Sequence, residues 1–105
     1  MAKPLQELTA ADLASVMSVV AHRQASDGSR ESWDVSLFTS RSDSPIATDV
    51  VGLPSPVSEE LVTEHVVFVL GREGLKLELP WRTRREGYFM SGVSTPDAAG
   101  GPSGA

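Results

Sequence analysis

The sequence predicts an α+β domain in which one N-terminal helix packs on a small, mainly antiparallel sheet of three to five strands. Three observations indicate this fold class. A capping motif and helical apolar spacing lie near the N-terminus, two later segments alternate apolar with polar residues, and the last fifteen residues are mostly Gly, Pro, Ser and Ala. With 105 residues, of which 40% are apolar, we expect a single domain over residues 1–90 and a disordered tail over residues 91–105.

The first expected element is a helix from about Thr9 to Gln24. Thr9 and Asp12 have the spacing of a capping box, in which the hydroxyl of the first accepts a hydrogen bond from the backbone of the second. The apolar residues that follow have the spacing of one helical stripe, namely Leu13, Val16, Met17 and Val20. The turn-forming residues 26–29 end the helix.

The next expected elements are two strands. Residues 33–39 alternate apolar with polar side chains, which predicts a half-buried strand. Residues 46–51 predict a shorter strand. Pro54 and Pro56 then end it, because proline lacks a backbone donor and fixes φ.

Residues 62–79 predict a β-hairpin. The segment from Val62 to Leu70 is rich in β-branched residues, and residues 75–79 alternate apolar with polar side chains after a glycine-containing turn. Ser58 and the two glutamates that follow it are able to begin a helical turn, but the β-branched run favours a strand.

The segment Trp81–Met90 is ambiguous between an arm, a bulged edge strand and a short helix. Its start is basic: residues 72–86 carry five basic and three acidic residues, whereas residues 1–71 carry four and ten. Arginine and tryptophan are enriched at binding hot spots. The candidate partner-binding residues, which we expect to engage an acidic protein surface, are Trp81, Arg82, Arg84 and Arg85. If this segment is a strand, Trp81 and Arg85 lie on one face and Arg82 and Arg84 on the other, so an arm or a helical turn is needed for all three arginines to serve one surface. One alternative is a nucleic-acid surface. The other is that the aromatic residues complete the core and the arginines pair with acidic residues of a second copy or of the same chain, such as Glu59, Glu60 or Glu64.

The expected strand Val62–Leu70 also predicts self-association. Residues 66–70 are all apolar, so both faces of this strand are apolar, and the one expected helix covers only one face of a sheet. A second copy is the commonest cover for the other face. We therefore expect a homodimer with His65, Val67 and Val69 at its interface.

No catalytic residue, metal ligand set or cofactor site is predicted. The chain has no cysteine, which excludes thiol chemistry and thiolate metal sites. Its two histidines, His22 and His65, lie 43 positions apart on different expected elements, without metal-binding spacing.

Charge and composition restrict the class of partner. The net charge of −5 disfavours indiscriminate binding to nucleic acid, and no apolar run is long enough to span a bilayer. The N-terminus lacks the apolar stretch of a signal peptide, so we expect a cytoplasmic protein. The absence of Asn and the excess of Arg over Lys indicate a GC-rich bacterial genome.

The expected function is that of a small non-enzymatic accessory or adaptor protein that binds another protein. A nucleic-acid-associated regulator that uses the segment Trp81–Arg85 is one alternative. A small enzyme with a site near His65 is the other, less favoured because the chain lacks a constellation of reactive groups.

Overall fold

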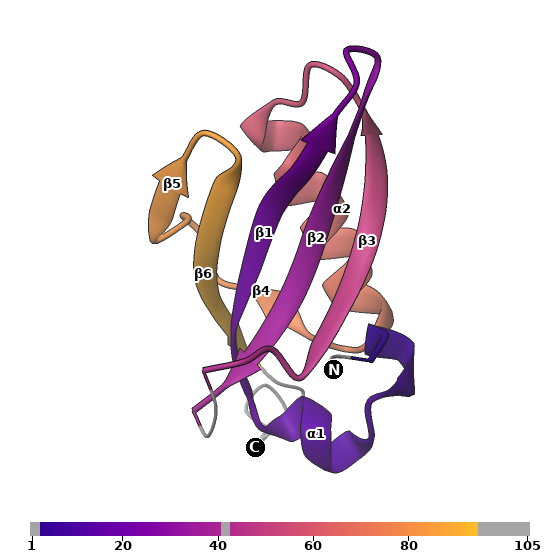
Figure 1. Ribbon diagram of the computed structural model, residues 1–105. Helices are drawn as coiled ribbons and strands as arrows, with labels where there is room; N and C mark the ends of the chain where they lie inside the picture. Colours follow the sequence, from indigo (N-terminus) through magenta and orange to yellow (C-terminus); the bar gives the residue numbers. More distant parts are fainter. Residues whose placement is uncertain (1–2, 41–42, 95–105) are drawn as a thin grey trace.

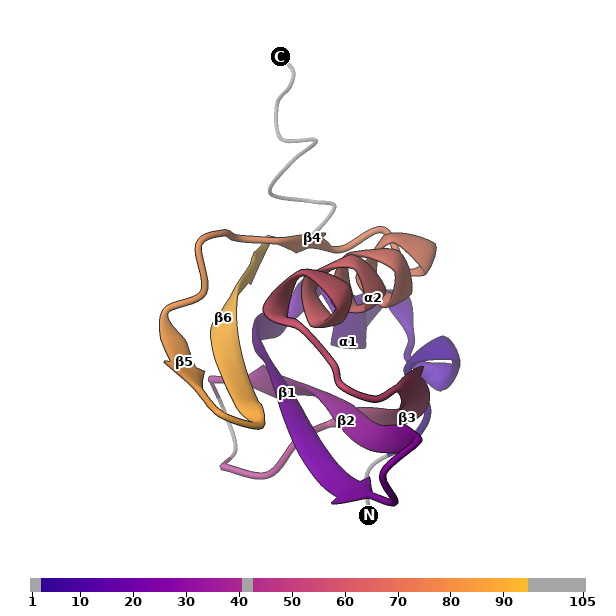
Figure 2. The ribbon, with the colours of Figure 1, turned by 90° about the horizontal axis from the view of Figure 1, so that it is seen from above.

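In the computed structural model, which describes residues 3–40 and 43–94, a curled antiparallel sheet wraps around one long helix (Figures 1 and 2). The strands in this part of the chain are β1 (Val16–Ser26), β2 (Arg30–Thr39), β3 (Ala47–Pro54), β4 (Lys76–Leu77), β5 (Thr83–Arg85) and β6 (Tyr88–Ser94). The helical segments are the short 3₁₀ turn Leu5–Glu7, α1 (Ala10–Ala14) and α2 (Glu59–Arg72).

The sheet order is β3-β2-β1-β6, and the outer edge of β6 carries two short strands. β4 pairs with one end of β6, at Val93 and Ser94, and β5 pairs with the other end, at residues 88–90. The link between β4 and β5, residues 78–82, therefore runs along the edge of the sheet (Figure 2), and its residues 79–81 lie close to the first turns of α2.

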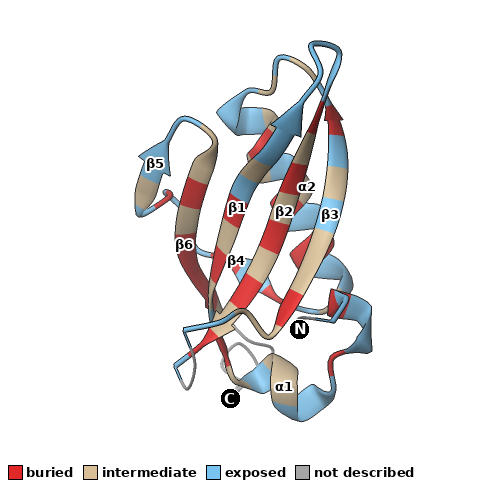
Figure 3. Cartoon of the chain, in the orientation of Figure 1, coloured by how far each residue is buried: buried red, intermediate tan, exposed pale blue. Residues whose placement is uncertain are grey.

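The core lies between α2 and the inner face of the sheet. Successive side chains of β1 and β2 alternate between the two faces of the sheet. Those on the inner face are buried, namely Val19, Ala21, Val35 and Leu37, and their neighbours point outward. The helix contributes the buried residues Val62, Val66, Val69 and Leu70, which recur at i, i+4, i+7 and i+8 (Figure 3).

The expected fold class is wrong, because the chain is mostly β and its N-terminal helix is only a short piece. The capping box is present: the backbone N–H of Asp12 donates to the Thr9 hydroxyl at 3.1 Å, and the Asp12 carboxylate accepts from the Thr9 backbone. The helix nevertheless ends at Ala14, and residues 16–26 form β1. Strand alternation buries Val19 and Ala21, and the β-branched valines fit it well, so the apparent helical stripe was coincidental.

The expected hairpin over residues 62–79 is also wrong, because residues 59–72 form α2. Ser58 caps this helix by accepting from the backbone of Leu61 at 3.1 Å. Gly74, with φ of 78°, follows the helix C-terminus, and the Leu75 backbone N–H donates back to the Leu70 carbonyl at 2.9 Å. This arrangement is a Schellman cap, so the glycine turn ends a helix where we expected it to join two strands.

The remaining expectations agree better with the structure. The predicted strand over residues 33–39 is confirmed within β2, and residues 46–51 overlap β3. The ambiguous segment forms the hairpin β5–β6, whose turn contains Gly87 with φ of 74°. Residues 91–94, expected in the tail, belong to β6, so the boundary at residue 90 is wrong. Residues 95–105 lie outside the described residues.

Candidate functional site

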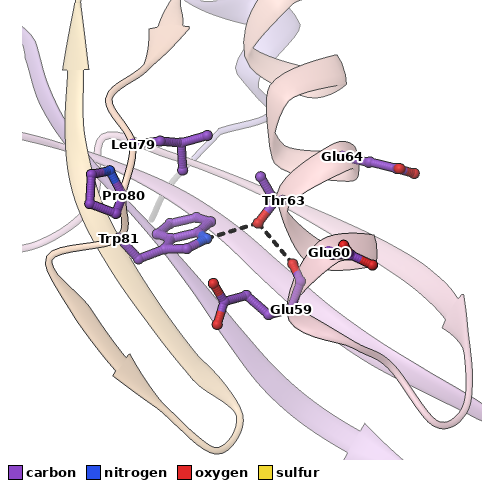
Figure 4. A pocket seen from close by; sticks show the side chains of 7 residues that line it. All are labelled: Glu59, Glu60, Thr63, Glu64, Leu79, Pro80 and Trp81. Carbon is purple, nitrogen blue, oxygen red and sulfur yellow. Dashed lines mark hydrogen bonds between the residues drawn. The ribbon is translucent and has the colours of Figure 1, made fainter.

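A groove lies between the N-terminal half of α2 and the link that joins β4 to β5 (Figure 4). It is open to solvent and has a volume of about 710 Å³. The helix contributes Glu59, Glu60, Thr63 and Glu64, and the link contributes Leu79, Pro80 and Trp81. Its apolar wall therefore comes from the sheet edge and its polar wall from the helix.

The wall formed by Trp81 is held in place by hydrogen bonds. The Trp81 indole N–H donates to the Thr63 hydroxyl at 2.9 Å, and this hydroxyl donates to the Glu59 carbonyl at 2.8 Å (Figure 4). The indole ring also contacts the ring of Phe89, with 5.5 Å between ring centroids. Only 5% of Trp81 is exposed, so it is a fixed part of the groove and not a mobile anchor.

The link is fixed to β6 on both sides of the groove residues. The backbone N–H groups of Glu78 and Arg82 donate to carbonyls of β6 at 3.0 and 2.9 Å. The buried Ser91 hydroxyl donates to the Glu78 carbonyl and contacts the Pro80 carbonyl at 3.5 Å. Between these attachments, Leu79 keeps 54% of its surface exposed.

The rim of the groove is acidic. Glu59 and Glu60 occupy the first turn of α2, where the helix dipole favours carboxylates, and Glu64 follows one turn later. Glu59 pairs with Arg84 of β5 at 3.3 Å. In the described ranges, the side chains of Glu60 and Glu64 have neither an ion pair nor a hydrogen bond. Two exposed negative charges therefore lie at the outer rim of the groove, where the Glu64 side chain points away from the Trp81 wall (Figure 4).

The predicted partner-binding residues do not form one surface. Trp81 is buried in the groove wall, and strand alternation puts Arg84 and Arg85 on opposite faces of β5. Each arginine has a partner within the chain. Arg82 pairs with Glu78 at 3.2 Å, Arg84 with Glu59, and the Arg85 guanidinium lies 4.8 Å from the centre of the Tyr88 ring. Binding of another molecule by this segment stays a prediction.

The predicted dimer-interface residues all lie on α2. A strand would have placed all three on one face, whereas the helix turns them in different directions. Val69 points into the core and is 3% exposed, so it offers no surface to a second chain. His65 is half-buried and Val67 is exposed. Val67 follows Thr63 by four residues, which places it on the groove side of the helix.

A buried carboxylate, Glu31, lies away from the groove. It accepts hydrogen bonds from the Trp33 indole and the Ser55 hydroxyl, both at 3.0 Å, and lies 3.9 Å from Arg23. Burial raises the pKa of Glu31, but the hydrogen bonds and the Arg23 charge outweigh burial, so the pKa is lowered. These contacts, made at a buried position, give the carboxylate a role in the stability of the fold.

Within residues 3–40 and 43–94, no group of three or more histidine or acidic side chains is placed to hold a metal ion. None of the helices in this part of the chain has the length and apolar character that a membrane crossing requires.

Sequence reasoning missed the groove because it missed α2. The signals were present in the serine cap at residue 58 and in the buried positions 62, 66, 69 and 70, which fit a helix and not a strand. Leu79 and Pro80 were interpreted as the end of a strand, and Trp81 as a partner-binding residue. Comparison of the chain with protein-family models, with curated proteins and with solved structures found no match.

Proposed function

We propose that this chain is a non-enzymatic binding protein that holds a basic, partly apolar segment of another protein in the groove beside α2. The observation that carries the proposal is the combination of an exposed apolar wall and two unpaired carboxylates in one open depression. The cytoplasmic location expected from the sequence stays a prediction.

The apolar wall supports a contact with apolar side chains. Leu79 is more than half exposed although its backbone is held on both sides, and Pro80 and Trp81 beside it line the groove. Val67 and Phe68 are also exposed on α2, and Phe68 keeps 63% of its surface. Exposed apolar side chains gathered near a groove are typical of interaction sites.

The rim determines the charge of the partner. Glu60 and Glu64 face no cation of the described chain, so a lysine or arginine of a partner gains an ion pair without displacing an internal one. Phosphate groups are repelled by the same carboxylates, which disfavours nucleic acid at this site. The acidic partner expected from the arginines of residues 82–85 is likewise disfavoured here.

The test uses a synthetic peptide of alternating lysine and leucine, with a glutamate–leucine peptide as its counterpart. Binding is followed by titration calorimetry at low and at high salt. We expect the basic peptide to bind, the acidic peptide not to bind, and added salt to weaken binding. The double variant Glu60→Gln with Glu64→Gln should bind roughly 2- to 30-fold more weakly, since it removes two exposed ion pairs that each contribute roughly 0.2–1 kcal/mol.

A matched control removes two acidic charges elsewhere. Glu7→Gln with Asp43→Asn changes the net charge by the same amount, at exposed residues outside the groove. It should leave peptide affinity almost unchanged, because the effect depends on position and not on total charge. Equal weakening by both double variants, or equal binding of the acidic peptide, would contradict the proposal.

A further inference from the structure

The outer side of α2 carries a row of four residues that continues the rim of the groove. Glu60, Glu64, Val67 and Gly71 follow one another at intervals of four, three and four residues, so they lie along one face of the helix. All four are exposed, and none belongs to the core. The same intervals separate the contact residues of two helices packed side by side. A second helix laid along α2 therefore meets all four.

The chemistry of this row changes along the helix. Its first two residues, Glu60 and Glu64, are acidic, whereas Val67 is apolar and keeps 46% of its surface exposed. A Cβ atom added at Gly71 would meet nothing within 4 Å outside the adjoining backbone of its own helix, so open space lies in front of it. Phe68, beside the row, is 63% exposed. A complementary ligand has cations at the acidic end and large apolar side chains at the other.

The walls of the groove determine which ligand conformation they can hold. The backbone N–H groups of Glu78 and Arg82 donate to β6, and Pro80 between them has none. Beyond its first turn, the backbone groups of α2 are bonded within the helix. β5 pairs only with β6 among the described strands, but two of its three residues are arginines, which repel a basic segment. An extended basic ligand therefore finds no row of backbone partners among the described residues that line the groove.

We propose that the segment bound beside α2 is an amphipathic basic helix, which lies along α2 over the open groove. This inference rests on the proposed function and adds the conformation and the residue pattern of the ligand. A helix satisfies its own backbone hydrogen bonds, so it needs only side-chain contacts from the walls. Glu64 points away from the Trp81 wall, so the ligand reaches it from the outer side of α2 (Figure 4). Leu79 provides the apolar contact across the groove.

Two peptides of the same composition separate a helical ligand from an extended one. Both contain equal numbers of lysine and leucine and are as long as α2. In one the leucines recur every three or four residues, and in the other lysine and leucine alternate. Titration calorimetry is done at concentrations where sedimentation shows each peptide alone to be monomeric. We expect the peptide with helical spacing to bind about tenfold more tightly or better, and its helical circular dichroism signal to rise on mixing.

One substitution at two exposed valines locates the ligand. Val67→Lys puts an ammonium group in the middle of the row, and Val50→Lys makes the same change on β3, where Val50 is 68% exposed. Val67→Lys should weaken binding of the helical peptide about tenfold or more, and Val50→Lys should leave it unchanged. Circular dichroism checks that both variants fold.

The results distinguish this inference from the proposed function. If the alternating peptide binds as tightly as the helical one, or if Val67→Lys weakens binding no more than Val50→Lys, the ligand is not a helix along α2. In either case the groove still binds a basic segment, and the proposed function stands. If neither peptide binds, the proposed function fails and the helical ligand fails with it.

Discussion

Glu31 shows how a single buried acid links the fold to pH. Its carboxylate accepts from Trp33 and Ser55, and its pKa is lowered in the folded chain by these bonds and by Arg23 against the opposing effect of burial. A carboxylate with a lowered pKa stabilises the fold above its unfolded pKa, near 4.5. That contribution is lost as the pH falls through the folded pKa.

We therefore expect Glu31→Gln to lower the urea midpoint at pH 7, because the amide has one accepting oxygen where the carboxylate has two, and it lacks the charge that attracts Arg23. The difference from wild type should shrink as the pH falls from 5 toward 3. Glu86→Gln removes the other carboxylate that pairs with Arg23, at an exposed position, and serves as the control with little effect. If Glu31→Gln lowered the urea midpoint as much at pH 3 as at pH 7, the ionised carboxylate would not be the form that stabilises the fold.

The arginines show how far residue-level reasoning reached. Internal pairing with Glu59, Glu60 or Glu64 was one of the expected alternatives, and Arg84 does pair with Glu59. Sequence reasoning also stated that a strand would separate the arginines onto two faces, which is the case in β5. Burial of the aromatic residues was part of the same alternative, and Trp81 is buried. Its partners Thr63 and Phe89 were not predictable, because they lie on elements that were assigned wrongly or left open.

At the scale of elements, a local signal fixed where a helix starts but not how long it is. Both side-chain caps, Thr9 and Ser58, accept the backbone hydrogen bonds expected of them. α1 has five residues and buries none, whereas α2 has fourteen and contributes four to the core. Helix length in this protein follows from tertiary burial, since short helices gain little from propensity alone.

The two caps give a paired prediction. Ser58→Ala should lower the free energy of unfolding by about 1 kcal/mol, the usual cost of losing a cap. Thr9→Ala should lower the free energy of unfolding by less than Ser58→Ala does, because α1 can fray without exposing a buried side chain of its own. Urea denaturation of both variants measures the difference. A larger loss for Thr9→Ala would mean that α1 supports the sheet more than its burial indicates.

At the scale of the whole molecule, one ring joins the two tryptophans. Phe89 of β6 stacks on Trp33 of β2 at 6.0 Å and contacts Trp81 of the groove at 5.5 Å. We expect Phe89→Ala to lower the free energy of unfolding by about 3–5 kcal/mol, the range for truncating a buried aromatic side chain. Tryptophan fluorescence and far-ultraviolet circular dichroism should lose their native signals together in wild type. Separate transitions would show that the sheet and α2 unfold independently.

The groove belongs to this scale as well, and this explains why the sequence did not predict it. Its walls come from residues 59–64 and 79–81, which meet only because β6 pairs with β1 and carries the link beside α2. Strand alternation in residues 33–39 needs only neighbouring residues and was predicted correctly. The order of the strands depends on how all the elements pack their apolar faces into one core, and the residues of a single segment do not determine it.

The pairing of Arg84 with Glu59 has a consequence for which ligands the groove can distinguish. Arg84 is a counterion that the protein supplies to itself, tethered at the mouth of the groove at an effective concentration that a free cation does not match. A ligand with one positive charge that takes Glu59 exchanges one ion pair for another and gains almost nothing. A ligand with two or more charges also reaches Glu60 and Glu64, which have no internal counterion to displace. Under the proposed function, the groove therefore favours ligands of higher valence, because a ligand with two positive charges pairs with both Glu60 and Glu64 whereas an isolated lysine pairs with only one of them.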